Sequence, residues 1–363
     1  MILMYLFFLK IFFIIDTIII VGDFVYTVYD YLKYYKNTSL EDVHWNALDN
    51  LVCAVLVYLP VKSFNKSFNL SEFCDYALKF RKNLPGMMAP ISYEILDIIK
   101  NCKRYKELSI SNFENVRTNE VQFGAATFRT DCETIVAFKG TDGSMIGWLE
   151  NCRLIYEYPT YTQKKAINYL NNNISFLDNE VYVVGHSKGG NLAMASAMET
   201  NKFKKIKKVY NFDGPGFRKK EFESLQFKKL KRKLVNILPT GSVVGVILNN
   251  DNYNVVLSNK LAFDEHFPTS WSVFGEYFVK GKLSLTSSQF HDRMSKGLEN
   301  LDDVKLKQLT ESFFKGFDKE YTSQFKLNFL DIRNFIRNAK NIDKQTANYL
   351  LEVVDSLFLN ERK

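Results

Sequence analysis

The segment GHSKG, residues 185–189, has the residue types and spacing of a serine nucleophile. It follows a short apolar strand pattern and precedes an apolar helix pattern. Glycines on both sides of a serine permit a strained strand-to-helix turn that lifts the hydroxyl out of the sheet. Backbone N–H groups at the start of the helix can then stabilise an oxyanion. We expect Ser187 to be a nucleophile; the alternative is a glycine-rich turn with a capping serine.

A serine nucleophile needs a general base, and the chain has four histidines. His44 precedes the sheet region, and His186 should point away from the neighbouring serine. His291 lies in a helical pattern that favours a structural role. His266 lies in a loop after a strand pattern and follows the serine in the order Ser, acid, His. We expect His266 to be the base; the alternative is a loop histidine that covers Trp271.

The expected acid is Asp213, which ends the strand pattern 208–212 and precedes a Gly-Pro-Gly turn. That turn would fix a carboxylate at the edge of a parallel sheet where ligands bind. The next strand pattern is followed by PTGSVVG, which contains no acid. A purely structural Asx turn is the alternative role for Asp213. The other candidates for the acid are Asp251, Asp264 and Glu265.

An oxyanion hole needs a second donor from the loop after an earlier strand, and FKGTD at 138–142 has the right position. The backbone N–H of Thr141, with its hydroxyl as a further donor, would join the backbone N–H of Lys188. The alternative for this segment is a plain β-turn.

The region that carries these residues, 116–300, begins with a hairpin pattern and continues as alternating strands and helices. Such alternation predicts an α/β fold whose mainly parallel sheet is covered by helices on both faces. The preceding part, 26–115, is expected to be helical and packed on this core. Its predicted helices cover residues 48–58, 71–82 and 91–103. The tail, 301–363, is expected to form a helical C-terminal extension.

Composition excludes several classes of protein. Of 363 residues, 46% are hydrophobic and 24% are charged, so the chain is neither disordered nor a coiled coil. Five scattered cysteines with no C-x-x-C pair predict neither a disulfide framework nor a zinc site, and no cofactor is implied. The net charge of +8 could suggest nucleic-acid binding, but the sequence contains no RNA-binding aromatic motif, so no nucleic-acid partner is expected. The sequence identifies no obligate protein partner.

The apolar N-terminal segment, residues 1–25, leaves three interpretations open. Its run over 1–22 contains Lys10 and Asp16, each costly at the centre of a membrane-spanning helix. The run could be a membrane-associated helix, a buried helix, or a leader upstream of a true start near Val25. No signal-peptide cleavage site follows it, so a cytoplasmic protein is expected. The alternative is a cytoplasmic protein that associates with a membrane through residues 1–22.

A basic strip over residues 202–233 holds thirteen Lys or Arg against three acidic residues. An anionic membrane surface could bind such a strip, because each well-placed cation contributes about 1 kcal/mol. The alternative is a solvated face with no partner.

Five motifs in order, FKGTDGSMIGW, VVGHSKGGNLA, NFDGPGF, PTGSVVG and EHFPTSW, give the chain a resemblance over residues 26–318. It resembles an uncharacterised bacterial family of lipase-like α/β-hydrolases that is distantly similar to class 3 lipases. The resemblance implies an α/β-hydrolase fold. In class 3 lipases the F-R-G-T or F-R-G-S segment supplies the oxyanion residue, which corresponds to Thr141, and G-H-S-x-G-G supplies the nucleophile, which corresponds to Ser187.

Two departures from the class 3 pattern matter. Lys188 replaces the usual apolar residue beside the serine, which suggests an anionic or polar group in the substrate. Ser242 stands about where class 3 lipases have their acid, which favours Asp213 for that role.

The expected function is therefore serine hydrolysis of an ester, with an acyl lipid as the favoured substrate. Two other functions stay open. One is a catalytically silent binding or scaffold protein that keeps the fold, and the other is a thioesterase or acyltransferase with the same triad.

Overall fold

The computed structural model describes residues 26–299 except 83 and 179, residues 302–315, 317 and 320–324, and four isolated positions beyond them. The apolar run over 1–22 and most of the C-terminal tail lie outside the described residues. Within the described part, no helix has the length and apolar character needed to cross a membrane.

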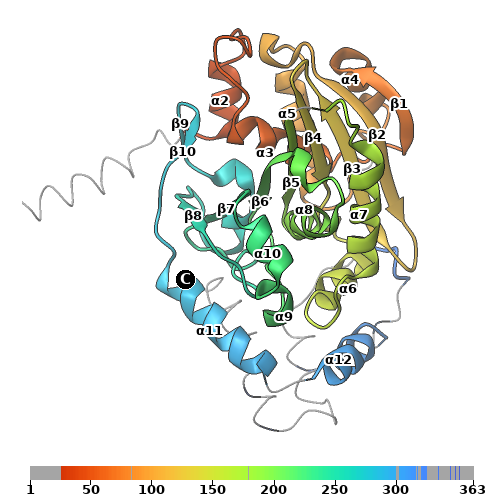
Figure 1. Cartoon of the computed structure of the whole chain (residues 1–363), viewed down its shortest axis with the longest axis vertical. Helices are drawn as coiled ribbons and strands as arrows, with labels where there is room; N and C mark the ends of the chain where they lie inside the picture. The colour runs from red at the N-terminus through yellow and green to blue at the C-terminus, as the bar shows by residue number, and fades with distance from the viewer. Residues whose placement is uncertain are drawn as a thin grey trace, which may run out of the picture.

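Eight strands of the described chain form one sheet, in which their spatial order is their order in the sequence (Figure 1). The strands are β1 Phe64–Asn69, β2 Ser109–Arg117, β3 Gln122–Arg129, β4 Glu133–Phe138, β5 Glu180–His186, β6 Ile206–Phe212, β7 Leu234–Pro239 and β8 Tyr253–Val256. Strands β1 to β4 pair antiparallel, and β4 to β8 pair parallel. A separate hairpin joins β9 Val273–Phe274 and β10 Tyr277–Phe278. The parallel half and its helical connections make this an α/β-hydrolase fold, as predicted.

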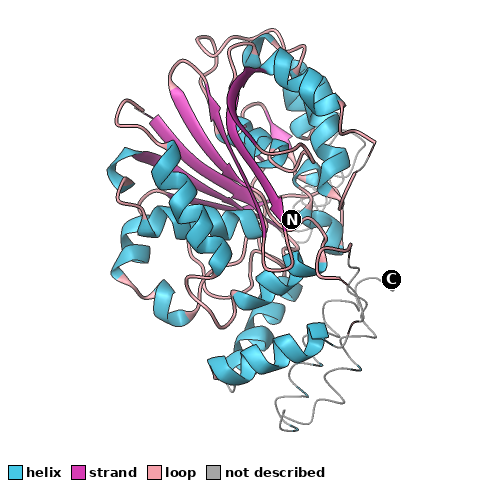
Figure 2. Cartoon of the chain, turned by 90° about the vertical axis from the view of Figure 1, so that its right-hand side faces the viewer, coloured by secondary structure: helices cyan, strands magenta, loops and turns pink. Residues whose placement is uncertain are grey.

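Helices cover both faces of the sheet (Figure 2). One face carries α2 Val28–Tyr34, α3 Ala47–Leu56, α4 Leu70–Leu78 and α5 Met88–Ile99. The other carries α7 Tyr161–Asn173, α8 Lys188–Glu199 and α10 Leu225–Leu230. The remaining α-helices are α6 Met145–Arg153, α9 Lys219–Phe222, α11 Leu285–Glu299 and α12 Asp303–Lys315. Short 3-10 turns lie at η1 Lys103–Tyr105, η2 Phe203–Lys205, η3 Ala262–His266 and η4 Pro268–Ser270.

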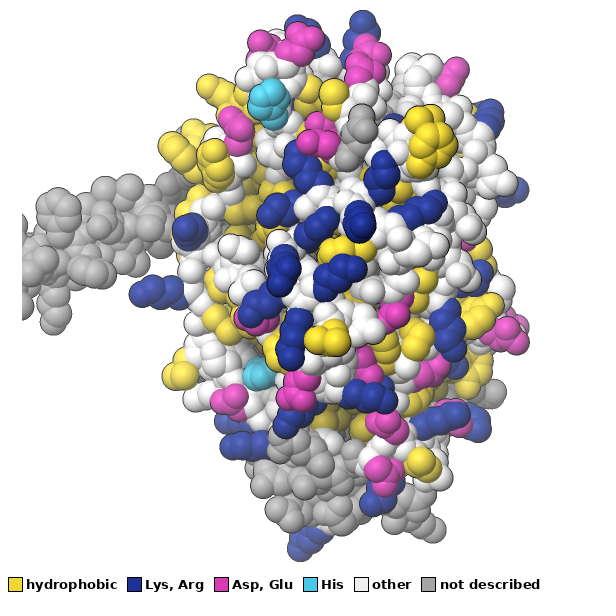
Figure 3. Space-filling model, in the orientation of Figure 1, with side chains coloured by type: hydrophobic (Ala, Val, Ile, Leu, Met, Phe, Trp, Pro, Cys, Tyr) yellow, Lys and Arg dark blue, Asp and Glu magenta, His cyan; other side chains and the backbone are white. Residues whose placement is uncertain are grey.

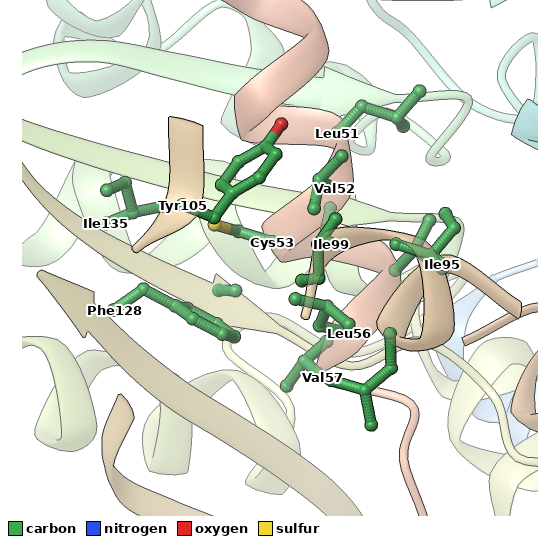
Figure 4. Close-up of a cluster of buried hydrophobic side chains, with 14 of the residues drawn as sticks. Leu51, Val52, Cys53, Leu56, Val57, Ile95, Ile99, Tyr105, Phe128 and Ile135 are labelled. Atoms are coloured by element: carbon green, nitrogen blue, oxygen red, sulfur yellow. The ribbon is translucent and has the colours of Figure 1, made fainter. Parts of the chain in front are cut away.

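Helix α3 is buried on every side and confirms the predicted helix before Pro60. Asn46 begins it with a capping box, in which its side chain accepts a hydrogen bond from the Leu48 N–H at 2.8 Å. Figure 4 shows its apolar side chains packed against α5 and against Phe128 and Ile135 of the sheet. Full burial fixes α3 on the sheet, and this places Tyr58, just beyond its C-terminus, beside the end of β5.

Two strands, β1 and β2, lie in the segment 26–115 that was expected to be helical, so that expectation is wrong for these residues. The pairing of β2 with β3 shifts register between Ser111 and Glu114, and Asn112 adopts a positive φ of 51° there. This bulge keeps Ile110 and Phe113 buried in the same core cluster although they are three residues apart. A spacing of three between buried residues is typical of a helix and not of a regular strand. Helices α4 and α5 agree with the predicted ones.

The basic strip 202–233 has two main groups of Lys and Arg, which precede or begin strands β6 and β7, and a smaller group at 218–220, which follows β6. Residues 202–208 precede and begin β6, and residues 228–233 lead into β7, so both groups lie at the N-terminal edge of the sheet. Figure 3 shows Lys and Arg side chains gathered in the middle of one face of the molecule. Two lysines of the strip form hydrogen bonds with backbone carbonyls: the Lys202 ammonium donates to the Asn171 carbonyl, and the Lys233 ammonium donates to the Ile206 carbonyl.

Candidate active site

Ser187 lies in the sharp turn between β5 and α8, with φ 59° and ψ −134°. A side chain at Gly185 would collide with the carbonyl of Gly189, and one at Gly189 would collide with the carbonyl of Phe138. The turn is therefore possible only with glycine at both positions. It places Ser187 at the C-terminal edge of the parallel strands, where this class of sheet binds ligands.

The structure brings Asp213 and His266 together, with 2.6 Å between Oδ2 of the carboxylate and Nδ1 of the imidazole. Asp213 follows β6 directly, has a positive φ of 50° and is fully buried. His266 ends η3, and 9% of its surface is exposed. Of the other candidate acids, Asp251 pairs with Lys231 and Glu265 accepts a hydrogen bond from the Gly241 N–H at 2.7 Å.

The second oxygen of Asp213, Oδ1, accepts hydrogen bonds from the Ser242 hydroxyl and, at 3.0 Å, from the Gly245 N–H. A side chain at Gly245 would collide with this oxygen, so glycine is required there. Ser242, which was expected to replace an acid, therefore helps to fix the orientation of the Asp213 carboxylate.

The other histidines have different surroundings. His44 is exposed at the surface, and the Nδ1–H of His291 donates to the Val246 carbonyl at 2.7 Å. His186 donates through Nε2 to the backbone carbonyl of His266 at 2.8 Å, and Tyr58 donates to the His186 carbonyl at 3.0 Å. Burial, and then the neighbouring His266, hold the pKa of His186 well below its ordinary value, so its ring is neutral. His186 therefore supports the loop that carries His266.

The expected oxyanion loop lies directly against the turn at Ser187. A side chain at Gly140 would collide with the Tyr58 hydroxyl and lie 3.2 Å from Cβ of Ser187. The Thr141 hydroxyl donates to Oδ1 of Asn151 at 3.0 Å, so it is already engaged. The Thr141 N–H has no hydrogen-bond acceptor among the described residues. The N–H of Lys188 is in the first turn of α8, where a helix supplies no acceptor of its own.

The side chain of Lys188 points into the protein, contrary to the expectation that it meets an anionic group of the substrate. It is 1% exposed, and its ammonium donates to Oε1 of Gln122 at 2.6 Å. The Gln122 amide in turn donates to the Gly140 carbonyl at 3.1 Å. Burial lowers the pKa of Lys188 to about 8. Gln122 thus connects the turn at Ser187 to the expected oxyanion loop. The apolar strand pattern around Gln122 did not predict this role.

Within the described residues the Ser187 hydroxyl forms no hydrogen bond with His266. Catalytic hydrogen bonds are often long in structures without substrate and tighten when substrate binds. Because Nδ1 of His266 is bonded to Asp213, Nε2 is the nitrogen left to accept a proton. The described residues contain no group of three or more His, Cys, Asp or Glu side chains that could hold a metal ion.

The chain is similar to one protein family and to solved structures of lipases. A family model described as Mbeg1-like matches residues 99–315. No curated protein matches the chain. The crystal structure of M37 lipase is 17% identical and has a TM-score of 0.35, over 55% of this chain and 69% of that one. Lip2 lipase from Yarrowia lipolytica is 13% identical and has a TM-score of 0.35, over 65% of this chain and 83% of that one.

Proposed function

The chain belongs to the Mbeg1-like family, and we propose that it is a serine hydrolase that cleaves acyl esters through Ser187, His266 and Asp213. The observation that carries the proposal is the 2.6 Å hydrogen bond between His266 and a fully buried Asp213. A buried carboxylate is costly unless it is paired and hydrogen-bonded. Here every partner of Asp213 fixes its orientation toward the imidazole.

In the proposed reaction the hydroxyl oxygen of Ser187 attacks the ester carbonyl while Nε2 of His266 takes the hydroxyl proton. Asp213 holds the imidazole in the right tautomer and stabilises the imidazolium. The N–H groups of Thr141 and Lys188 hold the oxyanion. His266 then returns the proton to the leaving alcohol, and water hydrolyses the acyl-enzyme by the same steps in reverse.

Acyl lipids are the favoured substrates because of the resemblance to lipases. A thioesterase or acyltransferase would use the same three residues and differ only in the leaving group or the acceptor. Turnover of matched oxygen and thiol esters, with and without an added alcohol acceptor, separates these activities.

A fluorophosphonate probe tests the proposal without knowledge of the substrate, because it reacts with activated serines. We expect the native protein to be labelled at Ser187, as read by mass spectrometry of the tryptic peptide, and the heat-denatured protein to remain unlabelled. If the native protein is not labelled, the scaffold alternative replaces the hydrolase.

Asp213→Asn should lower kcat by about 10⁴-fold, because an amide cannot stabilise the imidazolium and selects the wrong tautomer. The matched control is Asp251→Asn, which removes a carboxylate that pairs with Lys231 at the surface. We expect the control to keep nearly normal kcat in an ester hydrolysis assay. Equal effects of the two substitutions would remove Asp213 from the proposed triad.

A further inference from the structure

A cavity of about 470 Å³ is lined by residues that follow α3, α4 and β4 and by residues of strand β2. Its lining includes four cationic side chains, those of Lys79, Lys82, Arg117 and Lys139, and no acidic one. Asn115 and four apolar residues complete the wall. We call it the Lys139 cavity.

Lys139 is the unusual member of this group, because it is 2% exposed and has few partners. Its ammonium donates to Oδ1 of Asn115 at 3.0 Å and forms no ion pair with the described residues. An ammonium has three donors, and among the described residues only one of them has a hydrogen-bond acceptor. The aliphatic part of the Lys139 side chain lies over Gly124, where an added Cβ would be 2.8 Å from Cδ of the lysine. The strand therefore has room for this lysine only because it carries glycine at that point.

The other charges leave the cavity positive. Arg117 forms an ion pair with Asp142 at 2.7 Å, so its charge is offset. Lys79 also lines a neighbouring depression that contains Glu72 and Asp75. Lys82 and Lys139 form no ion pair within the described part of the chain. Consistent with this, burial lowers the pKa of Lys139 to about 8, and the nearby Asp142 offsets that effect only in part.

We propose that the Lys139 cavity binds a phosphate group. A phosphate offers several acceptor oxygens to cations that approach from different elements, and it would supply the partners that the Lys139 ammonium lacks. The phosphate is either a free anion or a substituent of the substrate, and the second source rests on the proposed function.

The cavity is connected to the proposed reaction by the segment 139–142. Lys139 begins this segment and lines the cavity, Thr141 supplies the proposed oxyanion donor, and Asp142 pairs with Arg117 of the cavity wall. Phosphate in the cavity therefore contacts the same short loop that holds the oxyanion.

Isothermal titration of the full chain with inorganic phosphate, at constant ionic strength, tests the site directly. We expect saturable binding, weakened about two- to fivefold by Lys82→Ala at the cavity mouth. Lys139→Met should abolish it, with circular dichroism to check folding. The control is Lys106→Ala, an exposed lysine outside the cavity, which should bind phosphate normally. Absence of saturable binding, or the same affinity in the Lys82→Ala and Lys106→Ala proteins, would overturn the proposal.

Hydrolysis assays identify the source of the phosphate. If the substrate carries it, Lys82→Ala raises KM for a phosphate-bearing ester and leaves KM for the matched neutral ester unchanged. If the phosphate is a free anion, added phosphate changes turnover of the neutral ester, and Lys82→Ala weakens that effect. The titration measures binding without turnover, so its result does not depend on the proposed hydrolase activity.

Discussion

Ester hydrolysis by the Ser187→Ala protein is expected to fall by about 10⁶-fold in kcat, to the rate that binding and the oxyanion donors alone sustain. The substitution removes the attacking oxygen and leaves the turn between β5 and α8 otherwise intact. Folding should be little changed, because the Ser187 side chain forms no hydrogen bond that holds α8. Kinetics with a chromogenic ester, together with thermal unfolding, measure both expectations.

A matched control for this substitution is Ser196→Ala, in the same helix. Ser196 is fully buried and donates to the Ala193 carbonyl at 3.0 Å, so the substitution removes only a hydrogen bond within α8. The kcat of the Ser196→Ala protein should remain close to that of the unmodified protein. Residual activity of Ser187→Ala near the normal value would mean that another group attacks the ester.

The second large effect is expected for His266→Ala, which should also lower kcat by about 10⁶-fold because the serine loses its base. His291→Ala is the control, since that histidine donates to a backbone carbonyl in a different loop. It should keep nearly normal turnover. Added imidazole should restore part of the activity of His266→Ala alone, because a small base can occupy the vacated space. If His291→Ala were the inactive protein, the assignment of the base would be reversed.

The serine turn and the strands that support it were predictable because their determinants are local. Glycines at fixed spacing around Ser187 are required by contacts with residues of the turn and of the adjacent strand. The alternation of strands and helices likewise predicted the parallel half of the sheet. Asp213 was favoured because no acid follows β7, and the structure places its carboxylate beside His266.

The supports of the site were not predictable, because they join segments that are far apart in sequence. Tyr58 and His186 are 128 residues apart, and nothing in either segment indicates their hydrogen bond. Lys188 was misinterpreted for the same reason: a lysine beside a nucleophile suggests a charged substrate, whereas its actual partner, Gln122, lies 66 residues earlier. The bulge in β2 shows a different limit, since an irregular strand can imitate the spacing of a helix.

The position of the basic strip has a consequence for the source of the substrate. Ten of the thirteen cationic residues of the strip, those in 202–208 and 228–233, lie at the N-terminal edge of the parallel strands, whereas Ser187 and Asp213 follow the C-terminal ends. The other three, at 218–220, follow β6 as Asp213 does. A strand of six or seven residues separates these edges by about 20 Å. A bilayer held by the ten residues would therefore lie at the edge of the sheet opposite Ser187. In this orientation Ser187 would face the water, and any substrate of the proposed hydrolase would reach it by diffusion.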